Sequence, residues 1–146
     1  MSMKDAGPDA RPEKLRRRRD FLAAARGVFR AMPLIVVQMR KRGDGGGPPR
    51  IGFTATKRIG NAVIRNRARR RMREAVRAMP DDLLLAGHDY VFIAREDTAQ
   101  GPFSQLKRQT ARALEKLRAG EGYAARARGM KRAGAKSRKQ NKGERP

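Results

Sequence analysis

Cysteine and tryptophan are absent from this chain of 146 residues, and histidine occurs once. Without cysteine there is no disulfide framework, no thiolate zinc site and no cysteine nucleophile. No apolar run approaches the roughly 18 residues that a membrane-spanning helix needs. The N-terminal residues include bases but no apolar segment behind them, which excludes a secretory signal, and Asp5, Asp9 and Glu13 argue against an organelle transit peptide. We therefore expect a cytoplasmic protein.

Acidic residues are scarce relative to basic ones. Lys and Arg number 37 and Asp and Glu 14, which gives a formal net charge of +23. Such a charge destabilises a compact monomer through self-repulsion unless a polyanion compensates it. Nucleic acid is the first candidate for that polyanion, and an anionic membrane surface is the second. Hydrophobic residues make up 38% of the chain, so only part of it can form a core.

The composition divides the chain into one domain and two tails. Residues 1–13 mix glycine, proline and charge, and we predict that they are disordered. Residues 119–146 carry nine Lys or Arg against two Glu, which predicts a flexible basic tail. Residues 14–118 between them have the length of a single domain.

Periodicity predicts the elements of that domain. In chain order they are a helix over 20–26, strands over 33–42 and 50–57, a helix over 61–79, a strand over 88–95 and a helix over 102–118. The two strands that flank the Gly- and Pro-rich segment 43–49 are expected to form an antiparallel hairpin. The order of elements predicts an α+β sandwich, with helices packed on one sheet.

The helix expected over 61–79 combines a basic face with an apolar one. Asn61 is a good N-cap, and Pro80 follows the helix end. At about 100° per residue, one arc of about 120° is apolar and contains Ile64, Ala68, Met72, Ala75, Val76 and Met79. The opposite face contains Asn66, Arg69, Arg70, Arg73 and Arg77, with Arg67 and Arg71 on one flank. Arg65 falls inside the apolar arc near the helix start, so we expect it to reach toward the end of the sheet.

A solvated surface is the simplest interpretation of a charged helix face, but this face has almost no local counter-charge. Glu74 is the only acid between Lys57 and Arg77. Like charges spaced four residues apart destabilise an isolated helix. The planar fork of arginine suits bidentate contact with phosphates and base edges. The arrangement therefore favours binding of RNA or DNA.

The segment "TKRIGNAVIRNRARRRMREAVR" (residues 56–77) closely resembles the signature of the protein subunit of bacterial ribonuclease P. That signature contains a basic pair, Gly-Asn-Ala, Arg-Asn-Arg, a variable residue, two basic residues and a further arginine. The matching positions are Lys57, Arg58, Asn61, Arg65, Asn66, Arg67, Arg69, Arg70 and Arg73. The resemblance extends from about Leu15 to the last helix and leaves both tails unexplained.

The resemblance implies a particular fold and a particular assembly. The fold is an αβββαβα two-layer sandwich on a mixed four-stranded sheet, with the arginine-rich helix in a left-handed βαβ crossover. The implied function is that of the ribonuclease P protein, which binds the catalytic RNA subunit, one protein per RNA, and the 5′ leader of precursor tRNA. The RNA catalyses endonucleolytic removal of the leader with Mg²⁺, and the protein itself has no catalytic residue and binds no metal or membrane.

The resemblance also implies two sets of binding residues. Contact with the RNA subunit is expected from Asn66, Arg67, Arg69, Arg70 and Arg73. Contact with the leader is expected from Phe21, Lys57, Arg58, Asn61 and Arg65, in a cleft between the first helix and one face of the sheet. Some relatives have further aromatics where this chain has Ala25 and, in our alignment, Val37. The sequence does not decide which sheet face Phe53 lines.

The remaining polar signals favour structural roles. His88 lacks a visible catalytic partner and is expected at the surface where a strand begins. The acids Asp81, Asp82, Asp89, Glu96 and Asp97 lie at loop and strand ends, where caps and turns are common, so we assign no protein metal site. Two alternative functions stay open. One is a structural RNA-binding protein of the ribosomal type, which only the Arg-Asn-Arg pattern distinguishes from a ribonuclease P protein. The other is an independent nuclease, against which the absence of a credible acid–base pair weighs.

Overall fold

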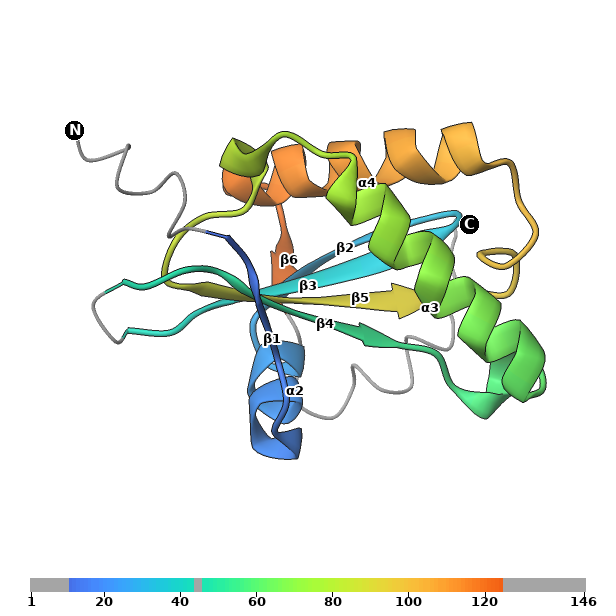
Figure 1. Cartoon of the computed structure of the whole chain (residues 1–146). Helices are drawn as coiled ribbons and strands as arrows, with labels where there is room; N and C mark the ends of the chain where they lie inside the picture. The colour runs from blue at the N-terminus through green and yellow to red at the C-terminus, as the bar shows by residue number, and fades with distance from the viewer. Residues whose placement is uncertain (1–10, 44–45, 125–146) are drawn as a thin grey trace.

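The fold is one mixed sheet with two helices on one face and a third helix on the other (Figure 1). The computed structural model describes residues 11–43 and 46–124. In chain order the elements are β1 (Glu13–Lys14), α2 (Arg18–Ala25), β2 (Val28–Met32), β3 (Ile35–Lys41), β4 (Arg50–Thr54), a 3-10 turn (Lys57–Ile59), α3 (Ala62–Arg77), a second 3-10 turn (Asp81–Leu83), β5 (His88–Ala94), α4 (Phe103–Arg118) and β6 (Tyr123–Ala124). The αβββαβα order and the mixed sheet are confirmed, and β1 and β6 add two short edge strands.

The predicted hairpin between the strands around residues 43–49 is wrong. The strand order is β1-β4-β5-β3-β2-β6, so β5 lies between β3 and β4. Phe92 of β5 is paired with Val37 on one side and with Phe53 on the other. The reason is visible in the sequence of β5, where an unbroken apolar run from Tyr90 to Ala94 suits a strand that is buried on both faces.

Strand β2 was not predicted, because it lies directly before the run that begins at Pro33. Its residues "VFRAM" show no strict alternation and include Arg30. The structure pairs β2 antiparallel with β3 from Val28↔Met39 to Met32↔Ile35. The tight turn between them contains Pro33, which cannot donate a ladder hydrogen bond and so suits a turn position. The hairpin of this domain is therefore β2–β3.

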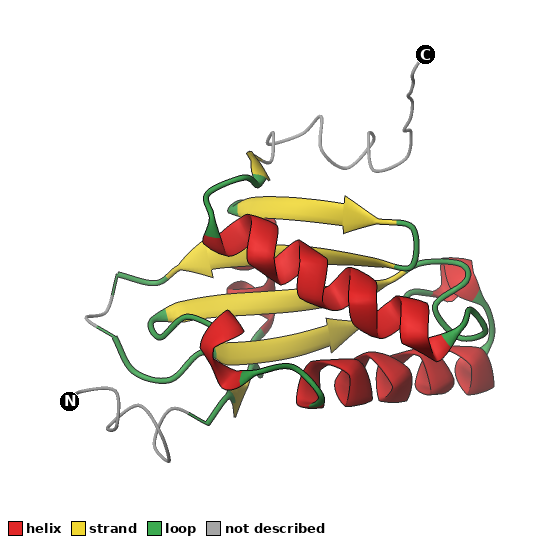
Figure 2. Ribbon diagram, turned by 90° about the horizontal axis from the view of Figure 1, so that it is seen from above, coloured by secondary structure: helices red, strands yellow, loops and turns green. Residues whose placement is uncertain are grey.

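Helix α3 connects two parallel neighbours, β4 and β5. Both strands point to the right in Figure 1, β4 lies nearer to the viewer, and α3 crosses above the sheet. From above, in Figure 2, the chain passes from β4 at the lower edge through α3 to β5 further up the page. This path makes the crossover left-handed, against the general preference for right-handed βαβ units. The family resemblance implied this handedness, and the residues alone did not.

The main core lies between the sheet and the α3 and α4 helices. From α3 it contains Ala68, Met72, Ala75 and Val76, which confirms the apolar arc, while Ile64 and Met79 are half-buried beside it. From α4 it contains Leu106, Thr110, Ala113, Leu114 and Leu117. Burial of these side chains supplies most of the apolar stabilisation and holds α3 rigidly, so its outward arginines have fixed starting positions.

Helix α2 packs on the opposite sheet face around a smaller core of Leu15, Ala24 and Val91. The Phe21 ring lies against β4 at Gly52, where an added Cβ would come within 2.5 Å of the ring. Only glycine permits that approach. The sequence assigned no helix to this second face, and the close contact fixes where the aromatic side chain of α2 can act.

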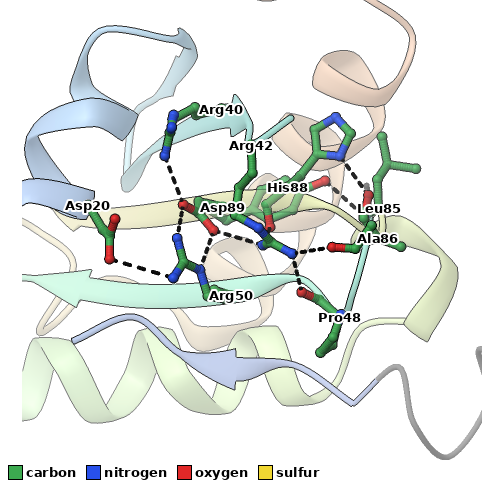
Figure 3. Close-up of polar contacts among 11 residues, drawn as sticks. Asp20, Arg40, Arg42, Pro48, Arg50, Leu85, Ala86, His88 and Asp89 are labelled. Carbon is green, nitrogen blue, oxygen red and sulfur yellow. Dashed lines mark hydrogen bonds and ion pairs between the residues drawn. The ribbon is translucent and has the colours of Figure 1, made fainter. Parts of the chain in front are cut away.

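A buried ion-pair network joins the ends of three strands (Figure 3). The Asp89 carboxylate is fully shielded, and Arg50 donates to both of its oxygens at 2.8 and 2.7 Å. Arg42 donates to it at 3.0 Å, and Arg40 at 3.4 Å. Arg50 also lies 3.5 Å from Asp20 of α2. The expectation that Asp89 serves in a cap or a turn is wrong, because its side chain is fully buried and is paired with three arginines.

Burial alone would raise the pKa of Asp89, but hydrogen bonds from Arg50 and Arg42, together with their positive charges, hold that pKa below its ordinary value. The carboxylate therefore stays ionised at neutral pH. His88, the residue before it, is half-buried, and its Nδ1 donates to the Ala86 carbonyl oxygen at 2.9 Å. Both residues thus serve the architecture of the strand ends.

The described residues extend the folded part slightly beyond the predicted domain. Glu13 is paired with Arg50 in β1–β4, and Tyr123 with Phe29 in β6–β2. The predicted boundaries at 13 and 119 therefore need correction at both ends, while residues 1–10 and 125–146 lie outside the described residues. In the part that the structure describes, no helix has the length and apolarity to cross a membrane.

Candidate nucleic-acid interface

The start of α3 is fixed by the cap that the sequence predicts. The Asn61 side chain accepts a hydrogen bond from the Ile64 N–H at 3.0 Å. Gly60 before it has a φ of +147°, and a Cβ there would lie 2.9 Å from the Ile64 side chain. Lys57 and Arg58 are exposed in the preceding 3-10 turn. The positive end of the helix dipole and two cations therefore lie together at the carboxyl end of β4.

The arginines of α3 have different surroundings, and the positions expected on the helix from the sequence predicted these differences only in part. Arg67 and Arg70 are exposed to solvent. Arg71 donates to the carbonyl oxygens of Ala99, at 3.1 Å, and Gly101, and its guanidinium lies 5.7 Å from the centre of the Phe103 ring. Arg71 therefore anchors α3 to the loop before α4. Its flank position in the sequence did not reveal this role, because the exposed Arg67 shares that flank.

Asn66 and Arg65 differ from these exposed arginines. The Asn66 side-chain oxygen accepts from Arg69 Nη2 at 2.6 Å, so Asn66 orients that guanidinium. Arg65 is half-buried, and its Nε is shielded from solvent without a hydrogen-bond partner among the described residues. A shielded donor in need of an acceptor separates Arg65 from the exposed Arg70.

The α3 arginines lack carboxylate partners. Of the side chains that the structure describes, no acid forms an ion pair with any arginine between Arg65 and Arg77. The described ion pairs are instead at Asp89, between Arg50 and Asp20, and near the C-terminal end of α4. The uncompensated charge is thus concentrated on one rigid helix, where a polyanion would relieve its self-repulsion.

The sheet face beside α2 carries fewer aromatic side chains than the corresponding cleft of some relatives. Phe21 lies on this side against Gly52, and Ala25 is half-buried on the same helix. Val37 was aligned with a cleft position, but this is wrong, because Val37 is fully buried in the α3–α4 core. Strand alternation directs Val36 and Gln38, rather than Val37, toward α2.

Phe53 faces α3, away from Phe21. Its ring stacks on Phe92 with centroids 5.4 Å apart, and the Arg73 guanidinium carbon lies 5.6 Å from its centroid. The open question about Phe53 is therefore resolved in favour of the α3 side. Phe21 and Phe53 therefore lie on opposite sides of β4, and Phe53 is the one that contacts an arginine of α3.

A groove of about 620 Å³ separates the C-terminal half of α3 from the N-terminal segment 11–15. Arg69, Arg73 and Arg77 line it from α3, and Arg11 and Lys14 line it from the other side. Sequence reasoning did not assign Arg11, Lys14 or Arg77 to any site. The four-residue spacing of Arg69, Arg73 and Arg77 was visible, but residues 11–13 of the segment that faces them were expected to be disordered.

In the described parts of the chain, residues 11–43 and 46–124, no three His, Asp or Glu side chains gather in a way that could hold a metal ion. The expectation that the protein itself binds no metal stays a prediction. The polar chemistry of the interface is therefore that of arginine, lysine and asparagine donors directed outward from a rigid helix, which suits phosphate recognition.

This fold and site define a class of protein: a compact α+β domain with an arginine-rich helix on its surface. The model of the ribonuclease P family matches residues 10–118. The chain belongs to the ribonuclease P protein family.

Several proteins that this chain resembles share one name. The "Ribonuclease P protein component" of Ruegeria pomeroyi is 50% identical over 107 residues, which cover 72% of this chain and 86% of that protein. The protein of that name from Caulobacter vibrioides is 46% identical over 107 residues, 73% of this chain and 72% of that one. The solved ribonuclease P protein of Thermotoga maritima is similar in structure, with a TM-score of 0.60 and 29% identity over 71% of this chain and 96% of that one.

Proposed function

We propose that this chain binds the RNA subunit of ribonuclease P and the 5′ leader of precursor tRNA in the cytoplasm, and that the RNA subunit catalyses leader removal. Membership of the family makes the chain a ribonuclease P protein component, a subunit of an endoribonuclease. The observation that carries the finer assignment is the rigid α3 helix, whose arginines have no described carboxylate partner. The RNA-protein holoenzyme requires Mg²⁺, for which the RNA supplies the ligands.

The two ends of the interface have separate tasks in this proposal. Asn66, Arg67, Arg69, Arg70 and Arg73 contact the RNA subunit. Phe21, Lys57, Arg58, Asn61 and Arg65 contact the leader, Phe21 by stacking on a base and the cations through phosphates. With alanine at residue 25 and Val37 turned into the core, leader binding depends more on backbone charge than on stacking.

The RNA that copurifies with the tagged chain tests this proposal directly. We expect one discrete RNA that cleaves precursor tRNA when it is supplied with Mg²⁺. Ribosomal RNA as the main copurifying species would instead support a structural RNA-binding protein. The washes should cover a range of salt concentrations, because non-specific RNA is released by salt much more readily than a specific partner.

Replacing Arg65 or Arg70 by alanine should affect different binding steps. Arg70 is exposed on α3, so Arg70→Ala should weaken binding of the RNA subunit whatever the substrate. Arg65→Ala should leave that affinity unchanged but weaken binding of leader-bearing tRNA more than leaderless tRNA. Each loss should be about 1 to 3 kcal/mol for a charge-assisted hydrogen bond.

Two titrations per variant measure these effects: RNA subunit into protein, then each tRNA into the assembled enzyme. Arg108→Ala, on the exposed side of α4, is the matched control and should change neither titration. Equal loss of RNA-subunit affinity in both variants, with unchanged leader preference, would show that α3 is one undifferentiated docking surface.

Truncation separates the basic tail from the fold. Removing residues 125–146 eliminates nine Lys or Arg but no described contact, so the thermal transition should stay unchanged. RNA binding should weaken, and its dependence on salt should become less steep, because fewer counterions are released.

Further truncation to Arg118 also removes β6 and the contact between Tyr123 and Phe29, whose ring centroids are 5.8 Å apart. This should lower the melting temperature slightly, since a two-residue edge strand buries little area. If the variant that ends at Ala124 loses the cooperative thermal transition, the tail is part of the fold and the prediction is refuted.

A further inference from the structure

The groove beside α3 has a charged rim and an apolar floor. The rim contains Arg69, Arg73 and Arg77 of α3, which Arg11 and Lys14 face from the N-terminal segment. Glu13 is the only acid that lines it. Ile51, Gly52 and Phe53 of β4 line the groove between these rims, together with Leu15 and with Phe21 of α2. Its remaining apolar lining residues are Val76, Met79, Pro80 and Leu84. Figure 1 shows the three elements involved: β4 runs beneath α3, and β1 crosses the near edge of the sheet to the left of that helix.

The rim has the spacing of a nucleic-acid strand. Arg69, Arg73 and Arg77 are four residues apart, so each rises about 6 Å above the previous one along the helix. That distance is close to the separation of successive phosphates in an unstacked strand. With one acid among six charged lining residues, the rim repels itself when the groove is empty, and a polyanion removes this repulsion.

The floor has a stacking platform. Phe92, Phe53 and the guanidinium of Arg73 form a column, with 5.4 Å between the rings and 5.6 Å from the second ring to the guanidinium carbon. Aromatic rings and guanidinium planes are the surfaces on which proteins stack unpaired nucleobases. An acidic peptide would satisfy the rim but make no use of this flat platform.

The size of the groove limits its occupant. A volume of about 620 Å³ is in the range of sites for small molecules, and a base must leave its stack to enter it. A base-paired helix would contact only the rim and leave the apolar floor empty. The exposed Arg67 and Arg70 on the same helix continue the basic surface outward, toward the RNA-subunit contact proposed above.

We propose that the groove between α3 and segment 11–15 holds one unpaired nucleotide of the RNA subunit, with its base on the Phe53–Arg73 platform and with phosphates of the adjoining backbone, two phosphate steps apart, on Arg69 and Arg77. The inference rests on the proposed function, which it deepens by assigning a nucleotide-binding site to one part of the docking surface. Segment 11–15 closes the site as the opposite wall and adds the charges of Arg11 and Lys14.

Site-directed cross-linking tests this proposal, and the absence of cysteine makes any introduced thiol unique. Met79→Cys places a photoactivatable aryl azide in the lining of the groove, and Ser104→Cys places the same probe at the exposed start of α4 as the control. Each protein is assembled with the RNA subunit and irradiated with and without precursor tRNA. We expect residue 79 to cross-link to a single unpaired nucleotide of the RNA subunit, at a position that residue 104 does not label.

Binding of the RNA subunit is measured first for both labelled proteins, so that two failures can be told apart. If neither protein binds the RNA subunit, the proposed function fails. If both bind it but residue 79 labels the tRNA leader, a paired region or no RNA, the function stands and the nucleotide site is overturned.

A second measurement removes the base itself. An abasic residue at the cross-linked position should reduce affinity for the wild-type protein by on the order of ten-fold, the value of one stacked base. The same abasic change should have little further effect in Arg73→Ala, which lacks the platform, but its full effect in Arg67→Ala, which is exposed elsewhere on α3. Additive losses in Arg73→Ala would overturn the proposal, because the base would then not contact the platform.

Discussion

Scrupulously RNA-free protein should not cleave precursor tRNA, whereas adding it to the RNA subunit at low Mg²⁺ should raise cleavage well above that of the RNA alone. The first half follows from the side chains. In the described chain no carboxylates gather for metal binding, His88 bonds to a backbone carbonyl, and Asp89 is enclosed by arginines. These groups leave no acid–base pair for phosphodiester hydrolysis.

The second half follows from charge and leader binding. Stacking one base and contacting a few phosphates should improve the affinity for substrate by about ten-fold to a hundred-fold, at roughly 1–3 kcal/mol per stacked base. The gain should shrink as Mg²⁺ or monovalent salt rises, because cations then screen the phosphates that the arginines contact. The measurement is the single-turnover cleavage rate against Mg²⁺ concentration, with and without protein. Metal-dependent cleavage at the mature 5′ end by RNA-free protein would overturn the assignment.

Asp89→Asn should destabilise the domain by about 3 to 5 kcal/mol at neutral pH, the usual consequence of removing one partner from a buried ion pair. Arg42, with a side chain only 8% exposed, would lose its carboxylate partner, and Arg50 would lose two short hydrogen bonds. The melting temperature should fall by roughly 15 °C or more for a domain of this size. Urea unfolding of both proteins measures the difference in the free energy of unfolding.

Two comparisons make this prediction specific. Arg40→Gln removes the longest of the three arginine contacts to Asp89, at 3.4 Å with the Arg40 side chain 32% exposed, and should lower the stability by less than about 1 kcal/mol. Asp97→Asn changes an exposed acid and should have almost no effect. If Asp89→Asn loses no more stability than Asp97→Asn, the network does not hold the strand ends together.

The same network should make part of the stability depend on pH. The folded-state pKa of Asp89 is lowered, so its stabilisation is complete above the ordinary carboxyl pKa of about 4 and is lost as pH falls toward the lowered value. The free-energy difference between wild type and Asp89→Asn should therefore narrow below about pH 4. A difference that stays constant from neutral to strongly acidic pH would contradict the assigned pKa direction.

The helices were the most predictable part of the fold, because a helix can be read from one face of a single segment. Asn61, the apolar arc through Met72 and the end before Pro80 specified α3 locally. The β2–β3 hairpin and the central place of β5 were not predicted, since strand pairing depends on residues that are distant in the sequence. The left-handed crossover could not be predicted from the residues either, because no single residue of α3 determines on which side of β4 the next strand, β5, is placed.

The candidate site was predictable to a similar degree. The sequence identified the basic face of α3 and the separate character of Arg65. It did not separate Arg71, which bonds to backbone carbonyls near α4, from its outward neighbours. It also placed Val37 in the wrong surroundings, because a one-residue change of strand register moves a side chain to the other face of the sheet.

The sequence by itself determined the net charge of +23, the basic helix and, through the Arg-Asn-Arg pattern, the ribonuclease P family. These properties are local or compositional and do not depend on which strands are neighbours. Only the tertiary structure decided that Arg69, Arg73 and Arg77 face segment 11–15 across a groove, and that Asp89 is enclosed by Arg40, Arg42 and Arg50. Both arrangements bring together residues from distant parts of the chain, and the packing of the sheet and helices, rather than any local preference, decides which of them meet.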